Sequence, residues 1–585
     1  MRRSMLYLTF QMRNSSNQLV VRLPAAEFNL ASAIERVAQV DGGRAAIVSE
    51  RHHLSYAEFV DRGRRLAALL HRRGLGCRTE RDHLAGHEVG QDLVAQLLYN
   101  SSEYLEGILG AARARSATIN LNYRYTAAEM RSILLDAAPA AIQYHARFAP
   151  MVAELVASVP SISLLLQVPD DSGAALLEGA VDYHAALAHT RPDVDIDVSA
   201  DDVHVIFTGG TTGSPRGVIW RQGDAIPQAM GVRNQREDRE WRSIEERVAC
   251  LPRTPRRVLP AAPFMHGAGQ WAALKTLIDG HTVVIQSSVE RFDPADIWNT
   301  VSDFGVHALT IVGDAFARPL LDELEQRPDR SRTLRTLISG GSALHHTNKA
   351  RFTSLVPGLT IVDTMGSSET GPQAQAITTT DHQAVEFRPN ESTLLASDDL
   401  TEFISPDDDA LGWIASAGRV PLGYLNDEAK SARTFPTIDG VRVAIPGDRA
   451  RWAAGGKLRV LGRDSVTINT GGEKVFAEEV EAVLKLHEGL VDVLVCGRPN
   501  ARWGNEVVAI VELRPGAAAP SLRALKRLCA KHLAAYKHPR AVIVVPHLQR
   551  GASGKPDYAW AAMIANDVLD DPGVSMPVQP NTENG

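Results

Sequence analysis

Short apolar runs alternate with amphipathic segments along most of this chain. The runs are bounded by glycine or polar residues and lie at 203–208, 281–286, 309–312, 337–339 and 359–362. They are apolar on both faces, which predicts buried strands of a largely parallel sheet. Between strands, Ser55 with Glu58 and Thr126 with Glu129 form the capping-box pattern that opens a helix. This alternation predicts a large α/β body of packed mixed sheets.

The pattern changes in the second half of the chain. From 411 to 462, short alternating segments are separated by Gly, Pro and Asp, which predicts a small β-rich subdomain within the body. The next segment predicts a smaller α+β domain, with helices near 478–487 and 521–534 and strands near 491–496, 506–513 and 541–545. The predicted division is an N-terminal extension at 1–25, an N-terminal domain at 26–463, a C-terminal domain at 464–565 and a disordered tail at 566–585.

Composition narrows the class of protein. The 585 residues are 44% hydrophobic and 22% charged, which is typical of globular proteins, and the net charge of −7 argues against nucleic acid as a partner. The four cysteines lie far apart without a CxxC pair, so we expect a reduced, cytoplasmic protein without a disulfide framework or zinc ribbon. Apolar runs such as 93–98 are too short to span a bilayer, although peripheral membrane contact remains open.

The most informative loop follows the predicted strand at 203–208. It combines glycines, hydroxyl groups and one cation, namely Thr208, Gly209, Gly210, Thr211, Thr212, Gly213, Ser214, Arg216 and Gly217. Glycines let backbone N–H groups approach an anion, hydroxyls add donors and the cation adds charge, so the loop is predicted to bind phosphates. It is not a Walker loop, because the Gly-Lys-Ser/Thr sequence is missing.

This loop resembles that of the adenylate-forming superfamily, which includes acyl-CoA synthetases, nonribosomal adenylation domains and firefly-type luciferases. The resemblance implies that the loop handles the pyrophosphate of ATP. The commoner form of the motif has serine at the position of Gly209 and lysine at that of Arg216. Arg216 keeps the positive charge, but its planar guanidinium grips phosphate differently from a lysine.

Further motifs match the same family in order. In the segment 364–370, the resemblance implies that Ser368 binds nucleotide phosphate and Glu369 holds Mg²⁺, while Met365 replaces an aromatic that stacks on adenine. Other implied contacts are Gly340 and Gly341 along the adenine, Asp448 on the ribose hydroxyls, and Arg463 on the ribose and phosphate. Asp464 or its neighbour is implied as the hinge between the body and a mobile C-terminal domain.

Two further motifs near the C-terminus match the family. In the family, one binds the CoA acceptor and the other contacts the reacting carboxylate. Gly471, Gly472 and Lys474 resemble the loop that lines a tunnel for the pantetheine arm of CoA. Ala477 stands where this family usually has proline. Lys555 resembles the lysine that contacts the carboxylate and the α-phosphate during adenylation.

Details of the body favour one branch of the family. Segments 120–125, 263–269 and 311–316 look like bacterial fatty acyl-CoA synthetases, especially the branch with steroid side-chain CoA ligases. Phe264, Trp271 and Phe316 are equally consistent with the wall of an acyl pocket and with ordinary core packing. His266 resembles a histidine that gates this pocket during thioester formation. Asp314 is a candidate partner for a substrate ammonium group, and equally a structural residue.

The resemblance implies a two-step ligase that uses ATP, Mg²⁺ and CoA. A hydrophobic acid, either fatty or steroidal, becomes an acyl-adenylate and is then transferred to CoA, with Lys555, Glu369, Thr211 and His266 as the candidate catalytic residues. One alternative delivers the acyl group to a carrier protein. Another is an ATP-binding protein without turnover, which the departures at Gly209, Arg216, Met365 and Ala477 favour. The segment 77–90 is interpreted as an inserted, solvated loop.

Overall fold

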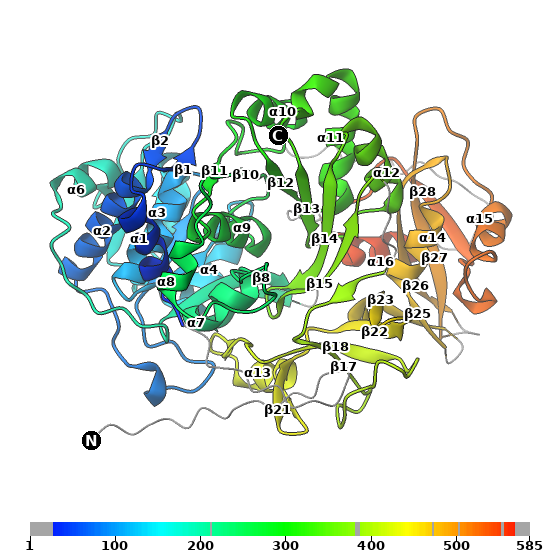
Figure 1. Cartoon of the computed structure of the whole chain (residues 1–585). Helices are drawn as coiled ribbons and strands as arrows, with labels where there is room; N and C mark the ends of the chain where they lie inside the picture. Colours follow the sequence, from blue (N-terminus) through cyan, green and yellow to red (C-terminus); the bar gives the residue numbers. More distant parts are fainter. Residues whose placement is uncertain are drawn as a thin grey trace.

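The computed structural model describes residues 27–210, 213–380, 386–470, 473–500, 504–550 and 555–567. Within these ranges a large N-terminal body lies beside a smaller C-terminal sheet domain (Figure 1). The predicted N-terminal extension lies outside the described residues, as does the predicted tail apart from 566 and 567. Those two residues end helix α16 (Tyr558–Asp567), so the helix runs two residues into the segment that was predicted to be disordered.

The first sheet of the body has five strands in the order β4-β3-β5-β6-β7, and all neighbours in it are parallel. Its strands are β3 (Leu93–Leu97), β4 (Ala117–Asn120), β5 (Ala141–His145), β6 (Leu164–Val168) and β7 (Val181–Asp182). The helices that alternate with them are α2 (Tyr56–Arg72), α3 (Ser102–Arg113), α4 (Ala127–Ala137), α5 (Ala149–Val156) and α6 (Tyr183–His189). Both predicted capping boxes are confirmed, at the start of α2 and of α4.

The second sheet has nine strands and carries much of the candidate site at its edge. Its order is β16-β15-β14-β13-β12-β10-β11-β1-β2. The strands are β1 (Ala45–Val48), β2 (His53–Ser55), β10 (Arg257–Pro260), β11 (Thr282–Val284), β12 (Ala308–Ile311), β13 (Thr336–Gly340), β14 (Thr360–Ser367), β15 (Gly371–Thr378) and β16 (Arg388–Pro389). Four of the predicted apolar runs form β11 to β14, which pair in parallel through β10, so the prediction is confirmed for them.

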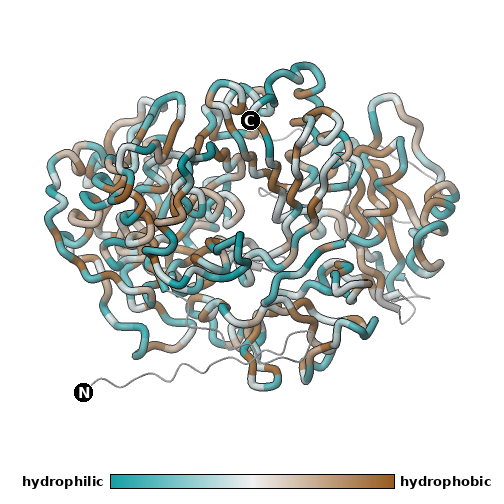
Figure 2. Tube along the Cα trace, viewed as in Figure 1, coloured by the Kyte–Doolittle hydropathy of each residue, from teal (hydrophilic) through white to brown (hydrophobic). Residues whose placement is uncertain are grey.

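Helices cover this second sheet in the body of the molecule. They are α1 (Leu30–Val40), α9 (Gly267–Ile278), α10 (Pro294–Asp303), α11 (Gly313–Gln326) and α12 (His346–Leu355). Short helices α7 (Gln222–Asp224), α8 (Ile244–Ala249) and α13 (Glu428–Thr434) lie in connections. Figure 2 shows hydrophobic strands inside this framework and more hydrophilic segments on the outer helices. Among the described residues, no helix is long and apolar enough to cross a membrane.

The run at 203–208 is an exception to the parallel prediction. It forms β8 (Val203–Gly210), which returns as the antiparallel strand β9 (Gly213–Arg221), and β9 also pairs with β19 (Gly423–Tyr424). The two faces of β8 contact different cores, because Ile206 belongs to one apolar cluster and Val205 to another. A strand buried on both faces is apolar in either orientation, so the pattern alone did not reveal the hairpin.

The predicted β-rich subdomain is confirmed as a six-stranded antiparallel sheet. Its strands are β17 (Thr393–Ala396), β18 (Gly412–Ala417), β20 (Thr437–Ile438), β21 (Val441–Ala444), β22 (Asp448–Ala453) and β23 (Lys457–Arg463). β23 ends where the C-terminal domain begins, so this sheet connects the body to that domain.

The C-terminal domain is a five-stranded sheet with helices. The strands are β24 (Thr467–Thr470), β25 (Glu473–Phe476), β26 (Leu490–Asn500), β27 (Gly504–Leu513) and β28 (Ala541–Val545). The helices are α14 (Ala477–Leu484), α15 (Leu522–Cys529) and α16. The predicted mixture of helices and strands is confirmed. The helix expected over 521–534 is shorter than predicted, because α15 ends at Cys529.

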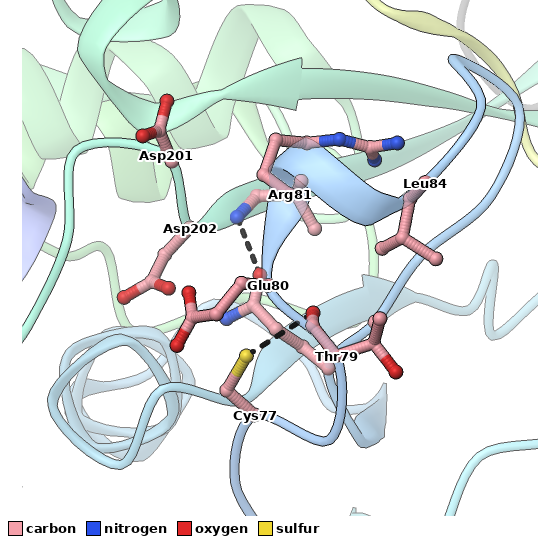
Figure 3. A pocket seen from close by; sticks show the side chains of 10 residues that line it. Cys77, Thr79, Glu80, Arg81, Leu84, Asp201 and Asp202 are labelled. Atoms are coloured by element: carbon pink, nitrogen blue, oxygen red, sulfur yellow. Dashed lines mark hydrogen bonds between the residues drawn. The ribbon is translucent and has the colours of Figure 1, made fainter. Parts of the chain in front are cut away.

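The segment 77–90 lies on the surface of the body, and none of its residues is buried. Figure 3 shows its small pocket, in which the Cys77 thiol donates to the carbonyl of Thr79 over 3.3 Å. Arg115 ties the segment to the start of β8, because its guanidinium lies 2.8 Å from Glu80 and 2.9 Å from Asp202. The structure therefore agrees with the interpretation of a surface loop.

A buried histidine makes the stability of the body sensitive to acid. His204 is 2% exposed and its Nε2 accepts a hydrogen bond from Trp271 over 3.3 Å. Burial lowers the pKa of His204 to about 4. The folded state therefore resists protonation that the unfolded chain accepts near its usual pKa, and stability falls as the pH drops from 6.5 toward 4.

We expect the substitution His204→Gln to reduce this acid sensitivity. The loss of unfolding free energy between pH 7.5 and pH 5 should be about 2 kcal/mol smaller in the variant, because one pKa unit corresponds to about 1.4 kcal/mol. Urea unfolding at the two pH values measures the difference. Equal losses in both proteins would contradict a buried neutral His204.

Candidate active site

Lys555 brings the C-terminal domain to the residues predicted in the body. Burial lowers the pKa of Lys555, and so does the neighbouring cation Arg463, whereas Glu369 and Asp448 act in the opposite direction. These are the charged groups that the motifs predicted around ATP. The structure therefore gathers Lys555, Arg463, Glu369 and Asp448 from four separate segments of the chain.

Asp448 and Arg463 face each other across one hairpin. They are register partners at the start of β22 and the end of β23, and Asp448 Oδ1 lies 3.4 Å from Arg463 Nε. The Asp448 carboxylate is the main cause that raises the pKa of Arg463. Asp464 follows directly, and its N–H donates to the carbonyl of Gly447 over 2.9 Å. Asp464, the predicted hinge residue, is thus hydrogen-bonded to the same hairpin as the pair.

Glu369 is held by a residue that the sequence motifs did not reveal. The hydroxyl of Tyr424 donates to Glu369 Oε1 over 2.8 Å. Burial and the charge of Glu369 raise the pKa of Tyr424, so the phenol keeps its proton. Tyr424 reaches this place because β19 pairs with β9, the strand that leaves the glycine-rich loop. That pairing of distant segments is not visible in the sequence pattern.

The backbone beside Glu369 is also fixed. Trp220, which is fully buried in β9, donates from Nε1 to the carbonyl of Ser368 over 2.9 Å. Met365 packs against the core of the β-rich subdomain, so this position contributes to the hydrophobic core. The segment after β14 is therefore held by side chains from β9 and β19 as well as by its own sheet.

The donor set suits a magnesium ion only together with phosphates. In the part of the chain that the structure describes, no cluster of three His, Cys, Asp or Glu residues could hold a metal ion. Tyr424 bonds to one oxygen of Glu369, and a single carboxylate is enough for Mg²⁺ when ATP oxygens and water complete the shell. Glu369 fits this requirement.

The glycine-rich loop joins β8 to β9 at the edge of the site. Thr208 is the register partner of Arg216, and Gly210 that of Gly213. Thr211 and Thr212 lie outside the described residues, and only the backbone of Gly209 is described. Arg216 forms an ion pair with Asp427, at the start of α13. Its predicted contact with phosphate stays a prediction.

The predicted adenine segment lies at the carboxyl end of β13. Gly341 has φ +78°, and Gly340 ends the strand. Gly313, with φ +51°, lies so close that an added Cβ would be 2.5 Å from the carbonyl of Ala343. Two backbone segments therefore pack closely against each other here.

His266 caps helix α9 beside Lys555. Its Nε2 is buried and has no hydrogen-bond partner among the described residues. Burial lowers its pKa to about 4, and the cations Lys555 and Arg124 add to the effect. His266 is therefore neutral at pH 7, with a buried ring nitrogen close to the group that is expected to contact the substrate carboxylate.

The aromatic residues near His266 do not form one wall. Phe264 and Trp271 share a buried cluster, whereas Phe316 packs against Phe292 with 4.4 Å between ring centroids. The structure therefore supports the core interpretation for Phe316. Asp314 contacts residues of the body, such as Arg318 and Asn348, and Lys485 of the C-terminal domain, which supports the structural interpretation.

The predicted pantetheine loop is described in part. Gly471 and Gly472 lie outside the described residues, and the backbone of Lys474 in β25 pairs with Asn469. Ala477 begins α14 as a buried residue. Next to it Glu478, which the motifs did not single out, lies so close to Gly462 that an added Cβ there would be 2.8 Å from its Oε2. Burial, Glu481 and Asp448 raise the pKa of Glu478 to about 7.

Comparison with known proteins decides the family. The profile of the AMP-binding enzyme family matches residues 34–394, and that of the AMP-binding enzyme C-terminal domain matches residues 479–555. The chain belongs to the AMP-binding enzyme family. The resemblance predicted from the phosphate loop and the later motifs is thus confirmed.

Several AMP-binding enzymes are similar over nearly the whole chain. The medium-chain acyl-CoA ligase Mig of Mycobacterium avium is 43% identical over 539 residues, which cover 91% of this chain and 98% of that protein. The 3-oxocholest-4-en-26-oate–CoA ligase of Rhodococcus rhodochrous is 36% identical, over 91% of this chain and 95% of its own length.

Solved structures of AMP-binding enzymes share the fold. The anthranilate CoA ligase AuaEII in complex with anthranoyl-AMP covers 93% of this chain and 98% of its own, with a TM-score of 0.76 and 18% identity. ATP-bound MatB from Rhodopseudomonas palustris covers 92% of this chain, with a TM-score of 0.74 and 23% identity. These likenesses confirm the predicted α/β body with its smaller C-terminal domain.

Proposed function

We propose that the protein is an AMP-forming acyl-CoA ligase for hydrophobic carboxylic acids, either fatty acids or steroids whose side chain ends in a carboxylate. The observation that carries the proposal is the placement of Lys555 among Arg463, Glu369 and Asp448. It is supported by relatives whose names describe medium-chain and steroid-acid CoA ligases. These four charged groups suit the binding of a nucleotide and a carboxylate. Their presence argues against the alternative of an ATP-binding protein without catalytic turnover.

In the first step the acid reacts with ATP. A carboxylate oxygen attacks the α-phosphorus, the bond to pyrophosphate breaks, and the acyl-adenylate forms. The Lys555 ammonium offsets negative charge on the carboxylate and the α-phosphate as they approach. Asp448 accepts hydrogen bonds from the ribose hydroxyls, and the loop at 208–217 receives the pyrophosphate. Ser368 would bind nucleotide phosphate, and Glu369 would hold Mg²⁺, which supplies charge neutralisation on the phosphates.

In the second step the acyl group moves to the thiol of CoA. The C-terminal domain turns about Asp464, withdraws Lys555 and presents the loop with Gly471, Gly472 and Lys474. The thiol releases its proton to solvent, its sulfur attacks the acyl carbonyl, and AMP leaves with the electron pair of the broken bond. The neutral His266 lies at the side of the acyl group and gates access for the thiol.

Mass spectrometry of the products tests this proposal. The purified protein is incubated with ATP, Mg²⁺ and a panel of fatty, aromatic and steroid side-chain acids, with and without CoA. We expect acyl-CoA, AMP and pyrophosphate from hydrophobic acids. An acyl-adenylate that accumulates and ignores CoA would point to a carrier protein as the acceptor, and the absence of any adenylate would contradict the proposal.

A further inference from the structure

A ring of four charges lies where the C-terminal domain contacts the body. Asp314 and Arg318 come from α11 in the body, whereas Lys485 follows α14 and Asp492 lies in β26 of the C-terminal domain. Figure 1 shows α14 beside α12 at this contact. His345, which precedes α12, also reaches across, because its Nε2 lies 3.4 Å from the carbonyl of Ala482.

Each cation of the ring contacts both carboxylates. Arg318 Nη2 lies 3.6 Å from Asp314 Oδ2 and 3.3 Å from Asp492 Oδ1. Lys485 Nζ lies 3.7 Å from Asp314 Oδ2 and 3.4 Å from Asp492 Oδ1. Positive and negative groups therefore alternate, and each domain contributes one of each sign.

The carboxylates of the ring are buried enough for these contacts to matter. The side chain of Asp314 is 4% exposed and that of Asp492 is 5% exposed. Asp314 Oδ1 accepts from the His345 N–H and the Asn348 amide, each over 2.8 Å, whereas Oδ2 has no hydrogen bond among the described residues. A buried carboxylate oxygen without a hydrogen bond depends on nearby cations, and one of the two comes from the other domain.

The ring is linked to the catalytic lysine through Asp492. The Oδ2 atom of Asp492 accepts from Arg550 Nη2 over 2.5 Å, and Arg550 precedes Lys555 by five residues. Burial alone would raise the pKa of Asp492, but Lys485, Arg318 and Arg550 hold it well below its usual range. Asp492 therefore stays charged and joins helix α11 of the body to the segment that leads to Lys555.

We propose that the ring of Asp314, Arg318, Lys485 and Asp492 is a latch that holds the C-terminal domain in the adenylating orientation, so that Arg318 and Lys485 are positioning residues for Lys555. This inference rests on the proposed function. Rotation of the domain breaks two contacts, Arg318 with Asp492 and Lys485 with Asp314. The contact of Arg318 with Asp314 in the body remains, and so does that of Lys485 with Asp492 in the C-terminal domain. Each domain therefore keeps one cation paired with one anion after the rotation. The latch can therefore release without leaving an isolated buried charge.

The test separates the two half-reactions. Variants Arg318→Met and Lys485→Met keep an apolar stem and remove a cation, whereas Arg318→Lys and Lys485→Arg keep the charge. Acid-dependent exchange of labelled pyrophosphate into ATP reports adenylation, and conversion of supplied acyl-adenylate with CoA reports thioester formation. We expect both methionine variants to lower the maximal exchange rate about 10-fold with unchanged KM for ATP, within the usual range of coupling between sites. Thioester formation should be unchanged or faster, and the charge-keeping variants should recover most of the exchange.

Arg351→Met is a matched control. Arg351 pairs with Asp322 and Glu325, so its ion pairs among the described residues join α11 to α12 within the body. We expect it to leave both half-reactions unchanged. Thermal unfolding checks that each variant is folded.

The outcomes distinguish the latch from the proposed function. Equal loss in both half-reactions, no loss in either, or failure of both methionine variants to fold would overturn the latch, because the ring would then be structural or inert. If the unmodified protein shows neither exchange nor thioester formation with any acid of the panel, the proposed function fails instead.

Discussion

Replacing Lys555 by alanine is expected to lower the rate of acyl-adenylate formation about 100- to 1,000-fold, the usual cost of losing one group that stabilises charge in a transition state. Lys555 is the group in this site that the C-terminal domain contributes, and its position beside Arg463, Glu369 and Asp448 fits contact with both the α-phosphate and the carboxylate. Pyrophosphate exchange measures the loss. KM for ATP should change much less than the maximal rate, because the interaction forms mainly as the reacting groups approach.

The same variant should still make thioester from supplied acyl-adenylate. The proposed rotation of the domain withdraws Lys555 from the site before thioester formation. We therefore expect this rate to stay within about threefold of that of the unmodified protein. Lys531→Ala, at an exposed position of the same domain, is the control and should change neither rate. A Lys555→Ala variant with normal exchange and no thioester formation would contradict the assigned role.

The second large effect is expected for Glu369→Gln. The amide oxygen of glutamine can still accept from Tyr424, so the substitution removes the negative charge while it keeps the hydrogen bond. We expect adenylation to fall about 100-fold at low Mg²⁺, in the range found for loss of one electrostatic contact, and part of the loss to be recovered at high Mg²⁺. Exchange rates across a magnesium titration give the measurement.

Tyr424→Phe serves as the companion to Glu369→Gln. It keeps the carboxylate and removes the hydrogen bond that orients it. A loss of about 10-fold is expected, at the lower end of what one hydrogen bond to a charged group contributes. Its dependence on Mg²⁺ should remain close to that of the unmodified protein. If Glu369→Gln showed an unchanged magnesium dependence, Glu369 would not be the metal-holding residue.

The sequence predicted the charged residues of the site better than their surroundings. Glu369, Asp448, Arg463 and Lys555 lie in short motifs whose residue types suit phosphate and ribose chemistry. No single motif was decisive, and the residues were recognised because the motifs occur together in the family's order. Tyr424 was missed because its role depends on the pairing of β19 with β9, which joins segments about 200 residues apart.

In the fold, too, elements that depend on local patterns were predicted, whereas pairings between distant segments were not. Parallel strands β11 to β14 followed from their apolar runs, and the capping boxes followed from short local patterns. The hairpin of β8 and β9 did not, because burial on both faces gives the same pattern in either orientation. Asp314 was singled out as a candidate partner for a substrate ammonium group or as a structural residue. Its cationic neighbour Lys485 could not be predicted, because it comes from a domain whose docking no local pattern encodes.

The most direct test of the account follows the oxygen atoms of the acid. A hydrophobic acid labelled with ¹⁸O in its carboxylate is incubated with the protein, ATP, Mg²⁺ and CoA, and the AMP is analysed by mass spectrometry. Attack of the carboxylate on the α-phosphorus predicts that each AMP carries one ¹⁸O and that the acyl-CoA keeps the other. Unlabelled AMP, or label in a phosphate released together with ADP, would contradict an acyl-adenylate made at the site of Lys555.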